Sequence, residues 1–203
     1  MIKNVVFDVG DVLVHFRYMD YMADLGFSKE EADFLAENMV LTEFWNKLDM
    51  GIEDEDKAVG YFQEKYPQYA DDIALFWEHI EDIVKEYDYA PGLVQGLKDK
   101  GYKVYALSNY PDKLSDLHWR HFKFLGLMDG HLISAKEKLA KPDKRFFRLL
   151  ESRFGLELSE CIFVDDRMVN IEAAAALGMQ TVHFTGADTL EYLSSLPSQG
   201  TEE

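Results

Sequence analysis

Residues 3–13 read KNVVFDVGDVL, and this stretch decides the fold class of the chain. Residues 3–7 are mostly apolar and partly β-branched, a pattern typical of a short strand buried on both faces. The run ends at a carboxylate, Asp8, and Gly10 follows two positions later. In α/β proteins ligands bind just beyond the carboxyl ends of parallel strands, so Asp8 stands where functional side chains are expected.

Three more apolar runs have the same character and are predicted strands: residues 102–107, 161–164 and 180–184. Helical patterns, each closed by a glycine, are found at residues 93–100, 144–154 and 169–177. This alternation predicts an α/β fold with a Rossmann-like, doubly wound parallel sheet. The first two runs end at Ser108-Asn109 and at Asp165-Asp166. Since the carboxyl ends of parallel strands share one edge, these side chains are expected to meet Asp8 there.

Between about residues 15 and 85 the pattern changes, because no strand is predicted and helical spacing dominates. Residues 28–31 form a capping box that begins a helix running toward Met39. The predicted domains are therefore an α/β core of residues 1–14 and 86–203 and an all-helical insert of residues 15–85. The chain from about residue 194 is rich in Ser, Pro, Gly and acids, which predicts a loose tail.

The composition limits the classes of function. The chain has 203 residues, of which 47% are apolar, so it can bury a substantial core. A net charge of −17 repels nucleic acid and anionic membranes, and neither is an expected partner. One cysteine, no apolar stretch of roughly 20 residues and no signal-like start predict a cytoplasmic protein. Oligomeric state is left open. A phosphorylated substrate would also be repelled, so its site needs local positive charge.

The polar residues at the predicted strand ends, taken in chain order, resemble the motifs of the haloacid dehalogenase (HAD) superfamily of hydrolases. The matching residues are Asp8, Ser108 in LSN (107–109), Lys141 in AKPD (140–143), and the pair Asp165-Asp166 with Asn170 four residues on. The resemblance covers nearly the whole chain. The segment FDVGDVL (7–13) is similar to a branch that includes sugar-phosphate phosphatases and carries a helical C1-type cap. Phe44, Trp45 and the turn at residues 49–51 resemble the substrate-facing segment of that cap, although Trp45 is expected in the core.

This resemblance implies a Mg²⁺-dependent phosphatase that hydrolyses a small phosphorylated metabolite, with sugar phosphates among the expected substrates. Asp8 would attack phosphorus and form an aspartyl-phosphate, which water then hydrolyses. A Mg²⁺ ion held by Asp8, the carbonyl of Gly10 and Asp166 would cancel the repulsion between carboxylate and phosphate. For Asp165, capping the following helix is expected as much as metal ligation.

The same resemblance assigns the remaining groups around the phosphate. Lys141 would add positive charge on the transferring group. Ser108 and the N–H of Asn109 would donate hydrogen bonds to the phosphate oxygens.

Gly10 departs from the commonest phosphatase pattern, which has a second Asp at this position to move protons to and from the substrate. General acid–base help of this kind is worth ~10²–10⁴-fold. Asp11, His15 or water could carry the proton instead, or the substrate could have a good leaving group. Two alternatives stay open: a phosphate- or metabolite-binding module with little turnover, and a metal-independent 2-haloacid dehalogenase. Members of the dehalogenase branch have a bulky aromatic residue where Gly10 stands.

Overall fold

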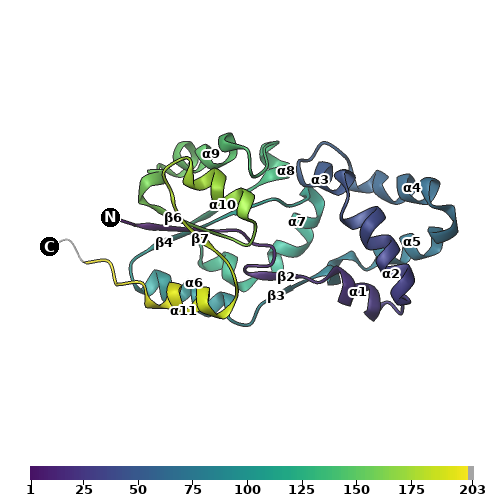
Figure 1. Cartoon of the computed structure of the whole chain (residues 1–203), viewed down its shortest axis with the longest axis horizontal. Helices are drawn as coiled ribbons and strands as arrows, with labels where there is room; N and C mark the ends of the chain where they lie inside the picture. The colour runs from purple at the N-terminus through teal and green to yellow at the C-terminus, as the bar shows by residue number, and fades with distance from the viewer. Residues whose placement is uncertain (201–203) are drawn as a thin grey trace.

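The computed structural model describes residues 1–200 and is built around a five-stranded sheet in the order β5-β4-β1-β6-β7 (Figure 1). The strands are β1 (Asn4–Phe7), β4 (Lys103–Ser108), β5 (Gly130–Ile133), β6 (Cys161–Asp165) and β7 (Gln180–His183). Every neighbouring pair in this sheet is parallel. The predicted α/β, Rossmann-like fold is confirmed.

Helices cover both faces of the sheet, with α6 (Ala90–Asp99) and α11 (Ala187–Ser195) on one side and α9 (Lys144–Phe154) and α10 (Met168–Ala175) on the other (Figure 1). Alternate residues of β1 enter the two resulting cores. Val5 and Phe7 join the larger core, whereas Val6 packs in the second core. All four residues of β1 are buried, as expected for a central parallel strand with a helix layer on each side.

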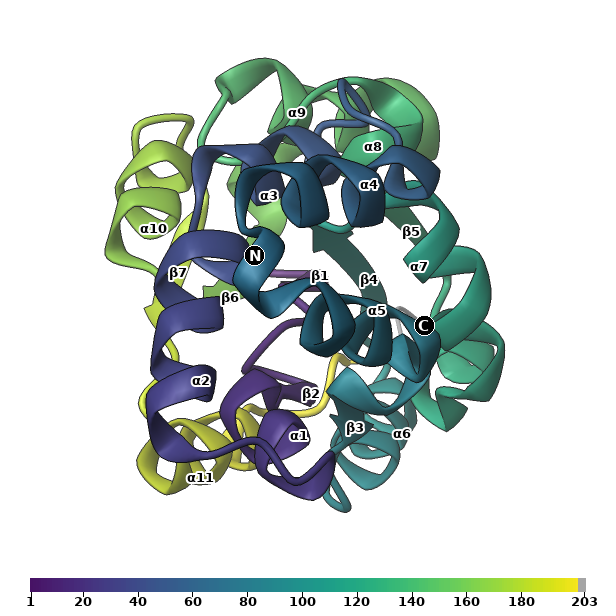
Figure 2. The same cartoon turned by 90° about the vertical axis from the view of Figure 1, so that its right-hand side faces the viewer.

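A run of helices lies between β2 (Val14–Phe16) and β3 (Val84–Glu86), and we call residues 18–83 the helical segment. It comprises α1 (Tyr18–Asp24), α2 (Lys29–Leu35), a π-helix (Ala36–Val40), α3 (Glu43–Asp49), α4 (Glu55–Lys65) and α5 (Ala70–Glu78). Ser28 and Glu31 form the predicted capping box at the start of α2. Figure 2 looks onto this segment and shows its helices in front of the carboxyl ends of the strands. The helical segment therefore covers the edge of the sheet where the strands end.

The remaining helices connect these elements. They are α7 (Asp112–His118), α8 (Ser134–Glu137) and 3₁₀ turns at Pro67–Tyr69, Ile80–Ile83, Trp119–His121, Lys123–Leu127 and Leu158–Glu160. Among residues 1–200 no helix has both the length and the apolar run that crossing a bilayer requires.

Two strand predictions were incomplete. The stretch from about 15 to 85 was expected to hold no strand, yet β2 and β3 pair antiparallel at its two ends. The edge strand β5 was not predicted either. Each of these strands has three or four residues and is stabilised by a distant partner, so no local periodicity marks it.

The prediction of a loose tail from about residue 194 was wrong through Gln199. Helix α11 continues to Ser195, and the Tyr102 hydroxyl donates to the Pro197 carbonyl at 2.9 Å. The N–H of Gln199 donates to the Lys100 carbonyl at 2.7 Å. These partners lie about a hundred residues away in sequence, which composition alone does not show. Residues 201–203 of the predicted tail lie outside the described part of the chain.

Candidate active site

Asp8 directly follows the central strand of the sheet, because β1 lies between β4 and β6. Ser108 ends β4 and Asp165 ends β6, so the two residues flank Asp8 on neighbouring strands. The Nζ of Lys141 lies 2.8 Å from Asp8 Oδ1 and 2.8 Å from Asp165 Oδ2. The expected convergence of the strand-end residues is therefore present, with the ammonium group between two carboxylates.

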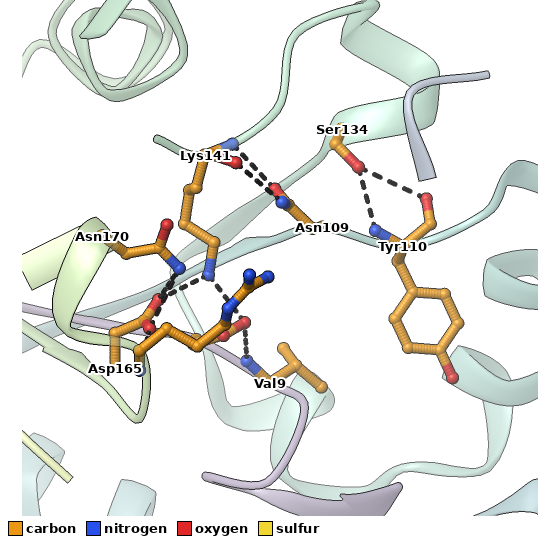
Figure 3. A network of polar contacts seen from close by, with 9 residues as sticks. Val9, Asn109, Tyr110, Ser134, Lys141, Asp165 and Asn170 are labelled. Atoms are coloured by element: carbon orange, nitrogen blue, oxygen red, sulfur yellow. Dashed lines mark hydrogen bonds and ion pairs between the residues drawn. The ribbon is translucent and has the colours of Figure 1, made fainter. Parts of the chain in front are cut away.

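The Asn109 side chain fixes the backbone that carries Lys141. Its Nδ2 donates to the Lys141 carbonyl at 3.0 Å, and the Lys141 N–H donates to its Oδ1 at 2.8 Å (Figure 3). Burial by itself lowers the pKa of Lys141, but Asp8 and Asp165 outweigh it and raise that pKa above its ordinary value. Lys141 is thus a fixed positive charge in a buried position. The sequence predicted Asn109 only as a backbone donor and missed this structural use of its side chain.

Asp165 and Asp166 are adjacent but have different environments. Asp165 is fully buried, and its oxygens accept from Asn170 Nδ2 at 3.0 Å, from Lys141, and from the Arg167 N–H at 2.8 Å (Figure 3). Asp166 is only partly buried and faces a cavity. Within residues 1–200, no other residue donates a hydrogen bond to its carboxylate. Burial, with Asp165 and Asp11 nearby, raises the pKa of Asp166.

Carboxylate oxygens of Asp8, Asp165 and Asp166 lie within 4.8 Å of one another. Burial is the main cause that raises the pKa of Asp8, to about 8; Lys141 opposes it, and the other two acids reinforce it. Such a concentration of negative charge is the environment that a bound cation stabilises. Ser108 ends β4, the neighbour of β1 in the sheet; its hydroxyl is buried and has no hydrogen-bond partner among residues 1–200. An orphaned buried hydroxyl at a strand end is expected where a ligand normally supplies the partner.

A cavity of about 390 Å³ separates this cluster from the helical segment. Asp8, Gly10, Asn109, Lys141 and Asp166 line it, as their predicted roles require, whereas Ser108 does not. Trp45 is 7% exposed; it packs in the core as expected and also lines the cavity.

Asp49 also lines the cavity; the turn at residues 49–51 was expected to face the substrate, but no role was predicted for this side chain. It ends α3 in the turn at residues 49–51, and its carboxylate has no hydrogen-bond or ion-pair partner among residues 1–200. Burial raises the pKa of Asp49 to about 7, against the opposing effect of Arg167 and Lys141. An unpartnered carboxyl with a raised pKa therefore lines the cavity from the helical segment.

Backbone contacts explain why Asp49 reaches this position. The Ser134 hydroxyl donates to the Asp49 carbonyl, and Lys138 Nζ donates to the Gly51 carbonyl at 2.7 Å. Gly51 has φ +60°, and a Cβ there would lie 2.6 Å from the Ala135 carbonyl oxygen. Only glycine permits this close approach of the turn to α8. The glycine was visible in the sequence, but its partner on α8 was not.

Asp11 and His15, the two residues considered as proton carriers, are placed less favourably. Asp11 lines the cavity, but its Oδ1 accepts from the Phe16 N–H at 3.0 Å. The His15 ring stacks on Tyr87 with the centroids 5.9 Å apart and is not part of the cavity lining.

A carboxylate and an acidic pair at the carboxyl ends of adjacent parallel strands, with a buried lysine from the loop before α9 between them, point to an α/β hydrolytic enzyme. The sequence matches the haloacid dehalogenase-like hydrolase family over residues 2–178, so the chain belongs to this family of hydrolases. The resemblance drawn from the motifs is thereby confirmed at the level of the family.

Several characterised proteins are similar over most of the chain. A sesquiterpene phosphatase of Aspergillus oryzae is 26% identical over 184 residues, which cover 90% of each protein. A flavin mononucleotide hydrolase of Arabidopsis thaliana is 27% identical over 197 residues, covering 91% of this chain and 73% of the relative.

Solved structures share the fold. A HAD-family enzyme of Bacteroides thetaiotaomicron, in complex with magnesium and inorganic phosphate, is 24% identical with a TM-score of 0.68, covering 93% of this chain and 97% of its own. A dehalogenase is 19% identical with a TM-score of 0.77, covering 98% of both chains. Because phosphatases and dehalogenases share this fold, the chemistry has to be argued from the site itself.

Proposed function

We propose that this protein is a Mg²⁺-dependent phosphatase that hydrolyses a small phosphate ester through an aspartyl-phosphate. The observation that carries the proposal is the cluster of Asp8, Lys141 and Asp166 at one end of the cavity, with the carboxylate of Asp166 unpartnered. The phosphatase and flavin mononucleotide hydrolase among the similar proteins support chemistry on phosphate esters. Their named substrates differ too much to select one for this chain.

A divalent cation suits the donor set of this cluster, since Mg²⁺ binds carboxylates and carbonyl oxygens. Asp8, the carbonyl of Gly10 and Asp166 would hold the ion, and Asp165 would orient Lys141 instead of ligating. When bound, Mg²⁺ supplies the positive charge that lets a phosphate dianion approach a carboxylate. This division of roles follows from the contacts of Asp165, whose oxygens already accept hydrogen bonds within the protein.

In the first step, an oxygen of Asp8 attacks phosphorus and the bond to the leaving oxygen breaks. Lys141 stabilises the charge on the transferring group, and the Ser108 hydroxyl and the Asn109 N–H donate to its oxygens. In the second step, water releases phosphate from Asp8. The helical segment, which contributes to the cavity wall, acts as the cap that shields both steps from bulk water.

We assign to Asp49 the proton that Gly10 cannot supply. Its unpartnered carboxyl belongs to the helical segment and lines the same cavity as Asp8. With a pKa of about 7, it is protonated in a large fraction of molecules at neutral pH and can donate to the leaving oxygen.

A metal-independent 2-haloacid dehalogenase is the second candidate. The similar dehalogenase structure has the same fold, which is compatible with this candidate but does not favour it over a phosphatase. The unpartnered Asp166 argues against it, since a free carboxylate beside Asp8 would repel a haloacid anion unless a cation lay between them.

The proposed function is tested by a hydrolysis screen. We expect the protein to release phosphate from acetyl phosphate and from a panel of small phosphate esters in the presence of Mg²⁺. Activity should be lost in excess EDTA and restored by added Mg²⁺. Turnover that is unchanged in EDTA would exclude the metal mechanism, and halide release from 2-chloropropionate without metal would favour the dehalogenase.

The two neighbouring acids should respond differently to substitution. We expect Asp166→Ala to weaken Mg²⁺ binding more strongly than Asp165→Ala. For Asp165→Ala the Mg²⁺ affinity should fall on the order of 10-fold, which is typical when a residue that contacts the metal ligands is removed. Asp165→Ala should instead lower the free energy of unfolding by about 1–3 kcal/mol, because the buried Asn170 amide loses its acceptor while Lys141 keeps Asp8. Calorimetric Mg²⁺ titration and thermal unfolding of both variants measure these effects. A weaker Mg²⁺ affinity in Asp165→Ala than in Asp166→Ala would reverse the assignment.

A further inference from the structure

The two ends of the cavity differ in chemistry. The end at the sheet is polar and carries the groups assigned above to phosphate and metal. Most of the remaining wall is apolar, and we call its apolar residues the apolar chamber: Val14, Phe16, Val40, Leu41, Trp45, Ile83, Val84 and Leu114. The chamber combines side chains of the helical segment, of the β2–β3 ribbon and of α7.

Few hydrogen-bonding side chains are available beside the apolar chamber. His118 lines the cavity, but its Nδ1 pairs with the Tyr110 hydroxyl at 2.6 Å and its Nε2 contacts the Ile80 carbonyl at 3.3 Å. Burial lowers the pKa of His118 to about 4, so the ring is neutral. Tyr110 and His118 therefore satisfy each other and are not free for a ligand. Asn46 and Asp49 are the polar side chains that the helical segment contributes to this wall.

This wall discriminates between kinds of leaving group. A sugar carries several hydroxyl groups that would lose water and find few partners in the chamber, which disfavours its binding. A hydrocarbon group gains from leaving water, by about fourfold in affinity for each buried methylene. The cavity, at about 390 Å³, is within the range of small-ligand pockets.

The exposed residues that line the cavity also suit an apolar ligand with an anionic group. Leu41 is 61% exposed in the helical segment and still lines the cavity. The exposed Arg167 lines the cavity from the core and has no ion-pair partner among residues 1–200. An apolar lip beside a free guanidinium group suits a ligand that has a hydrocarbon part and an anionic head.

We propose, building on the phosphatase function above, that the substrate is the phosphate monoester of an apolar alcohol whose hydrocarbon part occupies the apolar chamber. The bond that breaks joins phosphorus to the alcohol oxygen; Asp8 takes the phosphoryl group, and the alcohol leaves with a proton. This substrate class replaces the sugar phosphate that the sequence had suggested.

Binding of non-hydrolysable analogues tests the proposal without relying on turnover. Straight-chain alkylphosphonates of two to eight carbons are titrated into the full-length protein with Mg²⁺, and inorganic phosphate serves as the reference ligand. We expect affinity to rise about fourfold per methylene until the chamber is filled. The heat capacity change of binding should become more negative along the series. Equal affinities across the series, or tighter binding of a glucose phosphonate, would overturn the proposal.

A matched pair of variants tests whether the apolar chamber is responsible for the dependence of affinity on chain length. Leu41→Asn changes the lip of the chamber, whereas Ile52→Asn changes a side chain of similar exposure, 63%, elsewhere on the helical segment. Both positions are on the surface, so both variants should fold. We expect Leu41→Asn to weaken octylphosphonate binding several-fold and to leave phosphate binding unchanged, and Ile52→Asn to change neither. Equal effects of the two variants would contradict a role for the chamber wall.

Acetyl phosphate hydrolysis separates the two proposals, because its leaving group is too small to use the chamber. If acetyl phosphate is hydrolysed and alkylphosphonate affinity is flat, the phosphatase function stands and the substrate class is wrong. If affinity rises with chain length but no phosphate ester is hydrolysed, the chamber assignment stands and catalysis is wrong.

Discussion

Asp8→Asn is expected to reduce phosphate release from acetyl phosphate by on the order of 10³-fold or more, because the nucleophile is removed. The amide has nearly the shape of the carboxylate, and its oxygen can still accept from the Val9 N–H, which lies 2.6 Å from Asp8 Oδ1. Asn also replaces a buried carboxyl group whose pKa is raised by burial to about 8. The fold should therefore be retained, as measured by circular dichroism and thermal unfolding.

The exposed Asp188 on α11 offers the matched control, and Asp188→Asn should leave the rate unchanged. Acid quenching during turnover of labelled acetyl phosphate adds a second measurement. Wild-type protein should carry covalently bound phosphate, and Asp8→Asn should carry none. A variant with a few per cent of wild-type turnover, or with labelled protein, would show that Asp8 is not the nucleophile.

Asp49→Asn is expected to slow hydrolysis of alkyl phosphates by ~10²–10⁴-fold, the usual effect of losing a general acid. An alkoxide is a poor leaving group and needs a proton as the bond breaks, whereas acetate does not. Acetyl phosphate hydrolysis should therefore change little. Asp20→Asn, an exposed acid on α1, is the matched control. Equal losses for both substrates would mean that Asp49 only positions the helical segment.

The pH dependence of this effect has a definite sign. Arg167 and Lys141 favour the ionised form of Asp49, and Glu55 and burial oppose it, with a resulting pKa of about 7. The acid is the active form, so the ratio of the wild-type rate to the Asp49→Asn rate should fall as pH rises through 7. Because the pKa of this acid is raised on folding, the ionised form destabilises the folded state at higher pH. Asp49→Asn should accordingly not lower the melting temperature at pH 8.

The central part of the fold could be predicted because buried parallel strands are continuous apolar runs. β1, β4 and β6 correspond to such runs, and the polar residue at the end of each was visible in the sequence. β2 and β3 could not be predicted, since these three-residue strands exist only through pairing with each other across about seventy residues. The same reason applies to the chain after α11, which is held by Lys100 and Tyr102.

Some features of the candidate site could likewise be predicted from the sequence, and others could not. The convergence of Asp8, Lys141 and the acidic pair followed from the rule that parallel strands share a carboxyl edge. The different environments of Asp165 and Asp166 did not follow from this rule. They depend on which of the two carboxylates Lys141 and Asn170 contact. The resemblance placed the turn at residues 49–51 on the substrate side, but the environment of the Asp49 carboxyl could not be predicted, since it depends on how closely Gly51 approaches α8.

For the KNVVFDVGDVL stretch, the apolar pattern by itself determined a buried strand ending at Asp8, and with it the α/β class and the edge where the site lies. Apolar patterning and side-chain periodicity are local properties of the chain, so the sequence is enough for them. Only the tertiary structure decided that Asp165 holds Lys141 and that Asp166 is left free. It also decided that Asp49 and the apolar chamber face the strand ends. These features arise from contacts between residues far apart in the chain, and their free energies depend on burial that exists only once the helical segment has packed onto the sheet.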